Sequence, residues 1–342
     1  MTNLLFIGPF PPPTHGQALA TAVLFEKLVD AGVVLTQFDL SPALGVRKKI
    51  FAYLCALRLI LTGSGPVYIS VASNAGVWLT LMLGLACRLK NRAAFLHYHA
   101  YGPINRRAHV VRVLAFALGQ LGHHIVLGRA MAQSIAQLLP KNACVLELNN
   151  SGLIDLEPAK QCRSGGGLIL GHLSNLTIDK GVEVVISAAI SAIERGHDVK
   201  VVLAGPCADQ RSRDVIAYAS ERLGARFKYL GPVYGSEKLK FFSDIDVFLF
   251  PTMYVNEASP LVLLEAMACD VPCLSTDLGC IPDSLGTEGG IAVPIEQFEA
   301  ALRQLLNSIA LMPSAFAPRQ RFLHLLEAHQ AQFISLKDAI IQ

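Results

Sequence analysis

The sequence has no apolar run long enough to cross a membrane. A membrane-spanning helix needs about 20 consecutive apolar residues, but the apolar stretch 77–87 is much shorter, and the stretch 110–127 is interrupted by Arg112, Gln120 and two histidines. The first residues also lack the basic region of a secretory signal, and prolines interrupt their apolar run. We therefore expect a globular protein that stays in the cytoplasm.

Metal-binding and dinucleotide-binding patterns are missing as well. The eight cysteines include no C-x-x-C pair, and Cys269 and Cys273 have no histidine near them in the sequence, which argues against a zinc site. A chain of 342 residues with 52% apolar composition can form its cores without disulfides, so we expect buried, reduced thiols. No G-x-G-x-x-G follows the strands expected at 4–7 and 168–170, which argues against nicotinamide or flavin binding.

The charge is distributed unevenly. Residues 1–150 hold 13 of the 29 Lys and Arg but only 4 of the 26 Asp and Glu, a balance of +9, and the remainder holds 16 against 22, a balance of −6. A basic first half suits an anionic membrane surface or a phosphorylated acceptor. Nucleic acid is less favoured, because neither interleaved aromatic and basic residues nor a known binding motif accompanies the charge.

Residues 44–61 have the composition of an amphipathic basic helix. Arg47, Lys48, Lys49 and Arg58 lie among apolar residues, a pattern typical of a helix that lies in a membrane interface. An ordinary helix on a domain surface has the same pattern. Arg106, Arg107 and Arg112 add to the basic character of this half.

Short apolar runs alternate with helical patterns along the chain, in two successive series. Helices expected at 17–28 and 182–193 follow the first strand of each series, and a Gly-rich linker at 151–167 separates the series. This alternation predicts two Rossmann-like α/β domains with parallel sheets, facing each other across a cleft. The expected strands are 4–7, 67–71, 94–97 and 125–127, then 168–170, 199–203, 227–230, 247–250 and 272–275.

The segment 256–268 places one carboxylate before a helix and a second within it. Ser259 is a suitable N-cap and Pro260 suits the first helical position. The N–H groups of Leu261 and Val262 should then point outward at the positive end of the helix dipole. An anionic diphosphate would bind there.

The two carboxylates, Glu257 and Glu265, would flank such a diphosphate. Glu265 lies five residues beyond Pro260, about 7 Å along the helix axis. Its carboxylate could accept hydrogen bonds from a ribose while Glu257 faces the other end of the ligand. An ordinary capped helix with an incidental glutamate has the same spacing, so spacing alone leaves both interpretations open.

This segment resembles the E-x7-E signature of retaining glycosyltransferases of family 4. The resemblance rests on Glu257 to Glu265 and on the stretches 266–272 and 277–283, and it departs from the family at Asp270 and Cys280, where the family has Gly. It covers nearly the whole chain and implies the GT-B fold. The expected parts are an acceptor-side domain at 1–155, a nucleotide-sugar-binding domain at 156–317, and a helix at 318–342 that returns to the first domain.

The resemblance also implies a phosphate-binding loop around Lys180. In the family an Arg and a Lys neutralise the donor diphosphate, but this chain has Asn175 where the Arg is common. Asn175 can donate a hydrogen bond but supplies no charge, so neutralisation falls on Lys180 and the helix ends. An ordinary surface lysine at a helix start would be unfavourable against the dipole.

Two further loops are expected near the donor. The loop 8–17 ends at a helix start, where Gly16 would permit close backbone approach to the donor phosphates or the acceptor; a plain turn glycine is the alternative. By resemblance, the segment 231–234 with Val233 and Tyr234 borders the nucleotide base. Uracil and guanine are not distinguished.

Histidines lie at the carboxyl end of the expected strand 94–97, where α/β folds bind ligands. Resemblance favours His99 as the residue that faces the donor sugar or the attacking acceptor, with His97 on the same face; a lone histidine is more often structural. We discount the D-x-D pattern at Asp244 and Asp246 as a metal site, because it lies at the entry to an apolar strand. Lys180 and backbone N–H groups can balance the diphosphate instead, so no metal cofactor is expected.

The mechanism that the resemblance implies is transfer with retention, with His99, Glu257 and Lys180 as the catalytic residues. A donor phosphate oxygen helps to remove the acceptor proton, Glu257 holds the sugar and Glu265 the ribose. The expected role is extension of a cell-surface polysaccharide or lipid-linked oligosaccharide from a UDP- or GDP-linked sugar, with peripheral contact to the inner membrane face. The alternatives are a nucleotide-sugar epimerase and a non-catalytic protein that binds sugar nucleotides or acts as a membrane scaffold.

Overall fold

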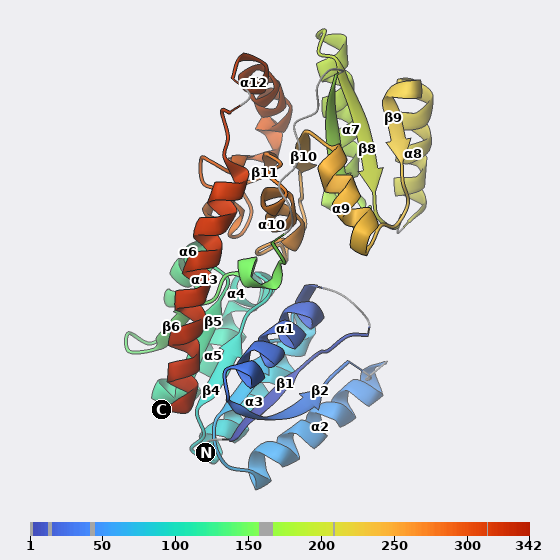
Figure 1. Cartoon of the computed structure of the whole chain (residues 1–342). Coiled ribbons are helices and arrows are strands. Elements are labelled where there is room, and N and C mark those ends of the chain that lie inside the picture. The colour runs from blue at the N-terminus through green and yellow to red at the C-terminus, as the bar shows by residue number, and fades with distance from the viewer. Residues whose placement is uncertain (1–2, 13–15, 42–44, 157–166, 208, 313) are drawn as a thin grey trace. The chain divides into compact units, whose positions relative to one another are not determined.

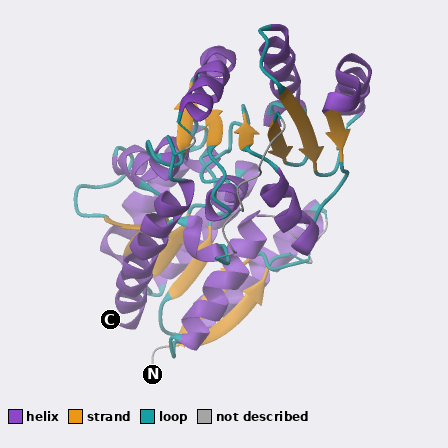
Figure 2. Cartoon of the chain, turned by 45° about the horizontal axis from the view of Figure 1, so that its top comes forward, coloured by secondary structure: helices purple, strands orange, loops and turns teal. Residues whose placement is uncertain are grey.

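The computed structural model describes residues 3–12, 16–41, 45–156, 167–207, 209–312 and 314–342. The chain divides into two compact units. Unit 1 comprises Met1–Leu153 with Glu327–Gln342, and unit 2 comprises Ile154–Leu326. Each unit contains one six-stranded parallel sheet with helices packed on it (Figures 1 and 2), so the predicted two-domain α/β fold is confirmed.

Unit 1 has the strand order β2-β1-β3-β4-β5-β6. Its strands are β1 (Asn3–Gly8), β2 (Val34–Asp39), β3 (Val67–Ser70), β4 (Ala94–His97), β5 (Gly122–Val126) and β6 (Cys144–Glu147). Its helices are α1 (Gly16–Asp30), α2 (Val46–Thr62), α3 (Val77–Leu89), α4 (Gly102–Asn105), α5 (Ala108–Leu118), α6 (Arg129–Ala136) and the end of α13 (Pro318–Ile341).

Unit 2 has the strand order β12-β11-β10-β7-β8-β9. Its strands are β7 (Leu168–Leu173), β8 (Val199–Ala204), β9 (Phe227–Tyr229), β10 (Val247–Phe250), β11 (Cys273–Thr276) and β12 (Gly290–Val293). Its helices are α7 (Val182–Glu194), α8 (Gln210–Leu223), α9 (Gly235–Asp244), α10 (Leu261–Ala268), α11 (Ile281–Leu285) and α12 (Phe298–Leu311).

The sequence of strand β10 is apolar throughout because the strand is buried on both faces of the sheet. Val247 and Leu249 belong to one core cluster, whereas Phe248 and Phe250 belong to another. Successive side chains of a strand point to opposite faces of the sheet, so the two clusters cover the two faces. A strand buried on both sides needs a continuous apolar run.

The last part of α13 completes the core of unit 1. Leu336 and Ile340 pack into the same cluster as Leu4 and Phe6 of β1 and Tyr68 of β3. The rings of Phe6 and Tyr68 stack with their centroids 4.0 Å apart. Residues distant in sequence therefore share one core.

All nine predicted strands are present, but β2, β6 and β12 were not predicted. Each of these three lies at an edge of its sheet. An edge strand is buried on fewer sides, and most residues of β2 and β6 are half-buried or exposed. The strand predicted at 168–170 is longer than expected, because β7 continues to Leu173.

Two other expectations concern the linker and the thiols. Residues 157–166 of the predicted linker lie outside the described residues, and Asn150–Leu153 form a 3-10 turn before them. Of the described cysteines, Cys87, Cys269, Cys273 and Cys280 are buried and reduced as predicted. The expectation is wrong for Cys55, Cys144 and Cys207, which are reduced but only half-buried. None of the described helices combines the length and apolar content needed to cross a membrane.

Candidate functional site

The helix that carries Glu265 begins one residue later than predicted. Helix α10 starts at Leu261, and Pro260 is its cap, with φ −68° and ψ 126° and no side-chain cap hydrogen bond. Proline fixes φ but not ψ, and the extended ψ of Pro260 keeps it outside the helix. The predictions that Ser259 is the N-cap and Pro260 the first helical residue are therefore wrong. Leu261 and Val262 are the first helical residues, whose N–H groups have no acceptor within the helix.

The structure joins Glu257 and Lys180, which are 77 residues apart. Lys180 Nζ lies 2.6 Å from Glu257 Oε2, and the two side chains are 22% and 10% exposed. The Thr252 hydroxyl donates a second hydrogen bond of 3.2 Å to the same carboxylate oxygen. Lys180 Nζ also lies 4.6 Å from the centroid of the Tyr254 ring, a distance at which cation–π attraction operates. The ammonium group is therefore held in place on two sides.

The backbone around Gly181 sets the position of Lys180. Lys180 ends a 3-10 turn, and Gly181 follows with φ 84°. A Cβ at Gly181 would lie 2.1 Å from the carbonyl oxygen of Pro251, so only glycine allows this approach. Met253 N–H donates to the Asp179 carbonyl at 2.7 Å. The Lys180 loop is thereby fixed to the loop that follows β10 and carries Glu257.

Glu265 is paired with a lysine that sequence reasoning missed. Lys238 Nζ of α9 lies 2.6 Å from Glu265 Oε1, and the two side chains are 33% and 14% exposed. Lys238 could have been predicted from its position one helical turn after Tyr234, because the segment 231–234 was already expected near the nucleotide base. Each glutamate of the E-x7-E segment thus holds a lysine.

The predicted donor residues of unit 2 follow the carboxyl ends of strands of one parallel sheet. Asn175 and Lys180 follow β7, Val233 and Tyr234 follow β9, and Glu257 follows β10. Asn175 is exposed, Val233 is buried, and Tyr234 is 71% exposed immediately before α9. The carboxyl ends of parallel strands meet at one edge of a sheet, where α/β folds bind ligands.

His172 of β7 lies fully buried beneath this edge. Its Nδ1 is 2.8 Å from the Leu249 carbonyl oxygen, which can only accept, so Nδ1–H donates. The other nitrogen, Nε2, lies 2.9 Å from the Ser174 hydroxyl. Burial lowers the pKa of His172 to about 4, with a further contribution from Lys180. The ring is therefore neutral at pH 7.

Two departures from the family pattern fall on turns. Asp270 follows α10 with φ 62°, a left-handed conformation that glycine adopts easily and aspartate tolerates. Cys280 is buried, and its N–H donates to the Ala258 carbonyl at 2.7 Å. Both positions shape the backbone around the Glu257 to Glu265 segment.

In unit 1, β4 ends at His97, and the His99 ring packs against His97. The two ring centroids are 3.9 Å apart with an interplanar angle of 38°, and His99 is half-buried. Gly16 begins α1, is exposed, and would have open space around a Cβ. Packing within the protein therefore does not require glycine at this position. Residues 13–15 of the predicted first loop lie outside the described residues.

The D-x-D pattern has local partners. The Asp246 carboxylate accepts a hydrogen bond of 2.8 Å from Ile169 N–H, and Asp244 lies 3.1 Å from Lys240. Asp246 thus ties the entry of β10 to β7. Among the residues that the structure describes, no group of three or more His, Cys, Asp or Glu side chains could hold a metal ion.

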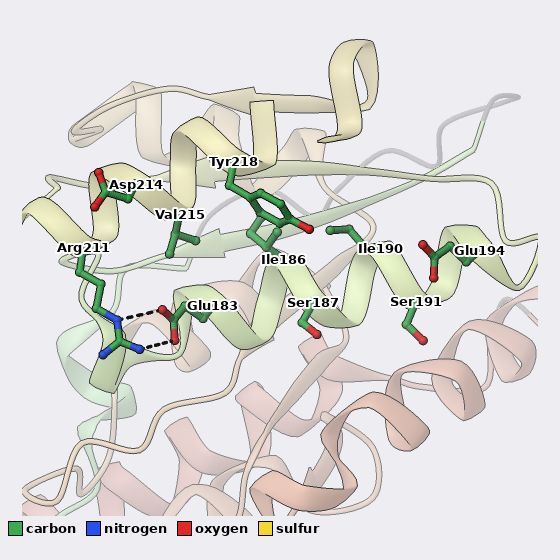
Figure 3. A pocket seen from close by; sticks show the side chains of 10 residues that line it. All are labelled: Glu183, Ile186, Ser187, Ile190, Ser191, Glu194, Arg211, Asp214, Val215 and Tyr218. Atoms are coloured by element: carbon green, nitrogen blue, oxygen red, sulfur yellow. Dashed lines mark hydrogen bonds and ion pairs between the residues drawn. The ribbon is translucent and has the colours of Figure 1, made fainter. Parts of the chain in front are cut away.

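A cavity of about 560 Å³ lies between α7 and α8, away from these residues. Ile186 and Ile190 of α7 and Val215 and Tyr218 of α8 line it, and the ion pair of Glu183 with Arg211 lies at one end (Figure 3). None of the predicted donor residues lines it. The candidate site therefore lies at the strand ends of unit 2.

Comparison with known proteins gives sequence relatives of one kind. Residues 167–308 match a family model described as glycosyl transferases group 1. The capsular polysaccharide biosynthesis glycosyltransferase CapM of Staphylococcus aureus is 26% identical over 147 residues, 42% of this chain and 38% of CapM. The putative glycosyltransferase EpsF of Bacillus subtilis is 26% identical over 213 residues, 60% of this chain and 52% of EpsF. The chain thus spans about half or less of these relatives.

Solved structures match over the whole chain. Sucrose-phosphate synthase from Thermosynechococcus elongatus has a TM-score of 0.73 at 17% identity, covering 100% of this chain and 99% of that one. The chain has the GT-B fold. HepE of Anabaena, solved in complex with UDP-glucose, has a TM-score of 0.69 at 15% identity, covering 99% of this chain and 100% of HepE. At these identities the likeness concerns the fold alone.

Proposed function

We propose that the chain is a retaining glycosyltransferase of family 4 that moves a sugar from a UDP- or GDP-linked donor to a glycan or lipid-linked acceptor in cell-surface polysaccharide synthesis. The observation that carries this proposal is the pair of glutamate–lysine contacts at the strand ends of unit 2. The group 1 glycosyltransferase match over residues 167–308 covers the same part of the chain. The similarity to CapM, a glycosyltransferase of capsular polysaccharide biosynthesis, supports the proposed pathway, and the UDP-glucose complex of HepE supports a nucleotide-sugar donor.

The two lysines and the start of α10 supply positive charge for a donor diphosphate. An ammonium group has three donors, so Lys180 and Lys238 can each keep a glutamate and still bind a phosphate oxygen. Leu261 and Val262 add N–H groups at the helix N-terminus. These groups together can stabilise the charge of a departing diphosphate without a metal ion. Glu257 then accepts from sugar hydroxyls and Glu265 from the ribose.

In the proposed mechanism the donor diphosphate itself takes the acceptor proton, and the configuration at the sugar carbon is retained. A phosphate oxygen removes the proton as the acceptor attacks on the face from which the leaving group departs. No glutamate acts as a covalent nucleophile in this scheme, unlike the carboxylate pair of retaining hydrolases. His99 of unit 1 faces the sugar or the acceptor, and Gly16 gives the backbone access to either.

The helical surface of unit 1 favours a membrane-bound acceptor. Helix α2 packs against α3, and α3 packs against α5. Large apolar side chains are exposed on all three, alongside Arg47, Lys48 and Arg112. Apolar and basic groups on one set of adjacent helices suit an anionic lipid surface. The exposed large apolar residues of these helices are Ile50, Phe51, Leu54, Leu59, Trp78, Leu85, Leu89, Val113 and Phe116.

The donor proposal is tested by calorimetric titration with UDP and GDP, with and without magnesium. We expect one nucleotide to bind independently of metal, Glu265→Ala to lose that binding, and Glu221→Ala, an exposed glutamate of α8, to keep it. Absence of binding by both nucleotides would contradict the proposal. With donor and candidate acceptors, turnover distinguishes a transferase from a binding protein, and a changed free sugar nucleotide would indicate an epimerase.

The membrane proposal is tested by sedimentation with anionic vesicles at low salt. Phe116 is 82% exposed on α5 and Leu311 is 88% exposed on α12 of unit 2. We expect Phe116→Ser to reduce vesicle binding and Leu311→Ser to leave it unchanged. No binding by the unmodified protein would exclude this part of the proposal.

A further inference from the structure

Two buried histidines in unit 1 line one small cavity. His97 at the end of β4 is 3% exposed, and His329 of α13 is 4% exposed. The Nε2 atom of each ring is buried and has no hydrogen-bond partner among the described residues. Both residues line the cavity, together with Asn149, Asn150 and Lys27. A buried polar nitrogen without a hydrogen-bond partner is unfavourable, so two at one cavity require an explanation.

The opposite nitrogen of each ring fixes its tautomer. His329 Nδ1 lies 2.7 Å from the Asn149 carbonyl oxygen, which only accepts, so Nδ1 carries the proton and Nε2 is an acceptor. His97 Nδ1 lies 2.7 Å from the Tyr68 hydroxyl. Burial raises the pKa of Tyr68, so the hydroxyl keeps its proton, and donating it to Nδ1 satisfies both atoms. His97 Nε2 then carries the ring proton and is a donor.

The cavity has the size for one small polar molecule. The cavity has a volume of about 10 Å³, and a single buried water molecule needs roughly 10–15 Å³. The unpartnered nitrogens of the two lining rings supply one donor, His97 Nε2–H, and one acceptor, His329 Nε2. We propose that this cavity binds one water molecule, which accepts a hydrogen bond from Nε2–H of His97 and donates one to Nε2 of His329.

Burial is the main reason that both rings are neutral. His99 and His329 face His97, and Lys27 of α1 faces His329. Burial lowers the pKa of each ring most, and each of these groups lowers the pKa of its neighbour further, whereas the hydrogen bond to the Asn149 carbonyl raises the pKa of His329. Neutral rings are what the water bridge requires, because a protonated His329 would have no acceptor at Nε2.

Gly152 makes room for this arrangement. A Cβ at Gly152 would lie 2.0 Å from His329 Nε2. The turn Asn150–Leu153 therefore approaches the ring closely, and any side chain at residue 152 would displace it. Asn149 next to this turn is also held to α13, because its N–H donates to Gln332 Oε1 at 2.9 Å.

The water bridge connects α13 to the histidine that we expect at the reaction centre. The His97 ring packs on His99 at 3.9 Å, so a ring fixed by Tyr68 and the water restricts His99 as well. His329 is thus a positioning residue; this second step rests on the proposed glycosyltransferase function. The water site itself does not.

The water site is tested without any substrate. Nitrogen-15 NMR of histidine-labelled protein at pH 8 should show opposite neutral tautomers for His97 and His329, and a crystal structure should show one water within hydrogen-bond distance of both Nε2 atoms. The exposed His324 of the same helix provides the control. We expect His329→Phe to change the His97 resonances and His324→Phe to leave them unchanged. Matching tautomers or a dry cavity would overturn the proposal.

The positioning role is tested by kinetics. His329→Phe should lower kcat by about 10- to 100-fold, the cost of a small misplacement in a site, with little change in nucleotide affinity. His329→Gln, which keeps an acceptor, should recover part of the loss, and thermal unfolding shows whether each variant folds. Equal kcat for His329→Phe and His324→Phe would overturn the positioning role. If nucleotide binding fails but the tautomers are opposite, the proposed function fails and the water site stands.

Discussion

At the scale of single residues, the candidate site consists of charge pairs. Glu257 and Glu265 are each within 2.6 Å of a lysine. A lysine between a carboxylate and a phosphate keeps its position whether or not the phosphate is present. The site is therefore preorganised for an anion, which reduces the cost of binding it.

Replacing Lys180 by Ala should weaken nucleotide binding by about 10- to 100-fold, since a hydrogen bond to a charged group contributes roughly 1.5–3 kcal/mol. Titration calorimetry measures the change. Lys200→Ala is the matched control, because Lys200 is exposed near the opposite, amino-terminal end of β8. Equal affinities for the two variants would remove Lys180 from the binding site.

A second expectation concerns pH. Burial lowers the pKa of His124 and of His172 to about 4, below the roughly 6.5 of an unfolded histidine. The unfolded chain thus binds protons that the folded chain does not, so stability is full above pH 6.5 and falls as the pH drops toward 4. At pH 5.5 the protonation of each histidine in the unfolded chain should lower the free energy of unfolding by roughly 1.4 kcal/mol.

Denaturant unfolding at pH 7.5 and pH 5.5 measures this loss. His124→Gln should reduce the pH dependence, whereas the exposed His324→Gln should not. A free energy of unfolding that is the same at both pH values would show that these rings titrate normally in the fold.

The sequence predicted the two glutamates, Lys180 and the loops around them as site residues, because these loops follow apolar strands and precede helices. It did not predict that Lys180 contacts Glu257 or that Lys238 contacts Glu265. Such contacts join residues 77 and 27 positions apart and depend on strand order, which local patterns do not encode. Ser259 was misplaced for a local reason, the extended ψ of Pro260.

At the scale of elements, the turn at Gly181 has a strict steric requirement near the site. Gly181 has φ 84° and a carbonyl oxygen 2.1 Å from where a Cβ would be. Gly196 has φ 91° but open space around a Cβ. An added side chain would be strained by the positive φ at both glycines, but it would clash with neighbouring atoms only at Gly181.

Gly196→Ala should therefore lower the free energy of unfolding by about 1–2 kcal/mol, the cost of the left-handed conformation. Gly181→Ala should lower it by roughly 3 kcal/mol or more and should also weaken nucleotide binding, because the clash displaces Lys180. Chemical denaturation and calorimetry measure both effects. Similar destabilisation by the two substitutions would show that the turn relaxes around the new methyl group.

Most strands that sequence patterns revealed are buried on both faces, with the edge strand β9 as an exception. Strand β10 reads as an unbroken apolar run, and its predicted limits match the structure. The edge strands β2, β6 and β12 were missed because they carry polar or half-exposed residues. Prediction failed where burial is incomplete, since burial produces the pattern.

At the scale of the whole molecule, unit 1 is built from two separate parts of the chain. Residues 327–342 contribute Leu336 and Ile340 to its core and His329 to its buried cavity. Unit 2 is one continuous segment. Removal of the last 16 residues should thus affect the two units differently.

A variant ending at Leu326 should lose amide protection in β1 and β3, because Leu336 and Ile340 pack on the core residues of these strands. The amides of β7 and β8 in unit 2 should remain protected. Hydrogen exchange followed by mass spectrometry measures protection strand by strand. Nucleotide binding should persist, because its residues lie in unit 2. Unchanged protection of β1 would show that α13 adds little to unit 1.

This division also sets an order of events while the protein is made. The ribosome delivers residues 1–153 first, then all of unit 2, and only then the residues that complete unit 1. Until residues 327–342 have been made, Leu4, Phe6 and Leu28 therefore lack the apolar neighbours that α13 provides. Chaperones that bind exposed apolar segments should act on the first half of the nascent chain, even though it emerges earliest.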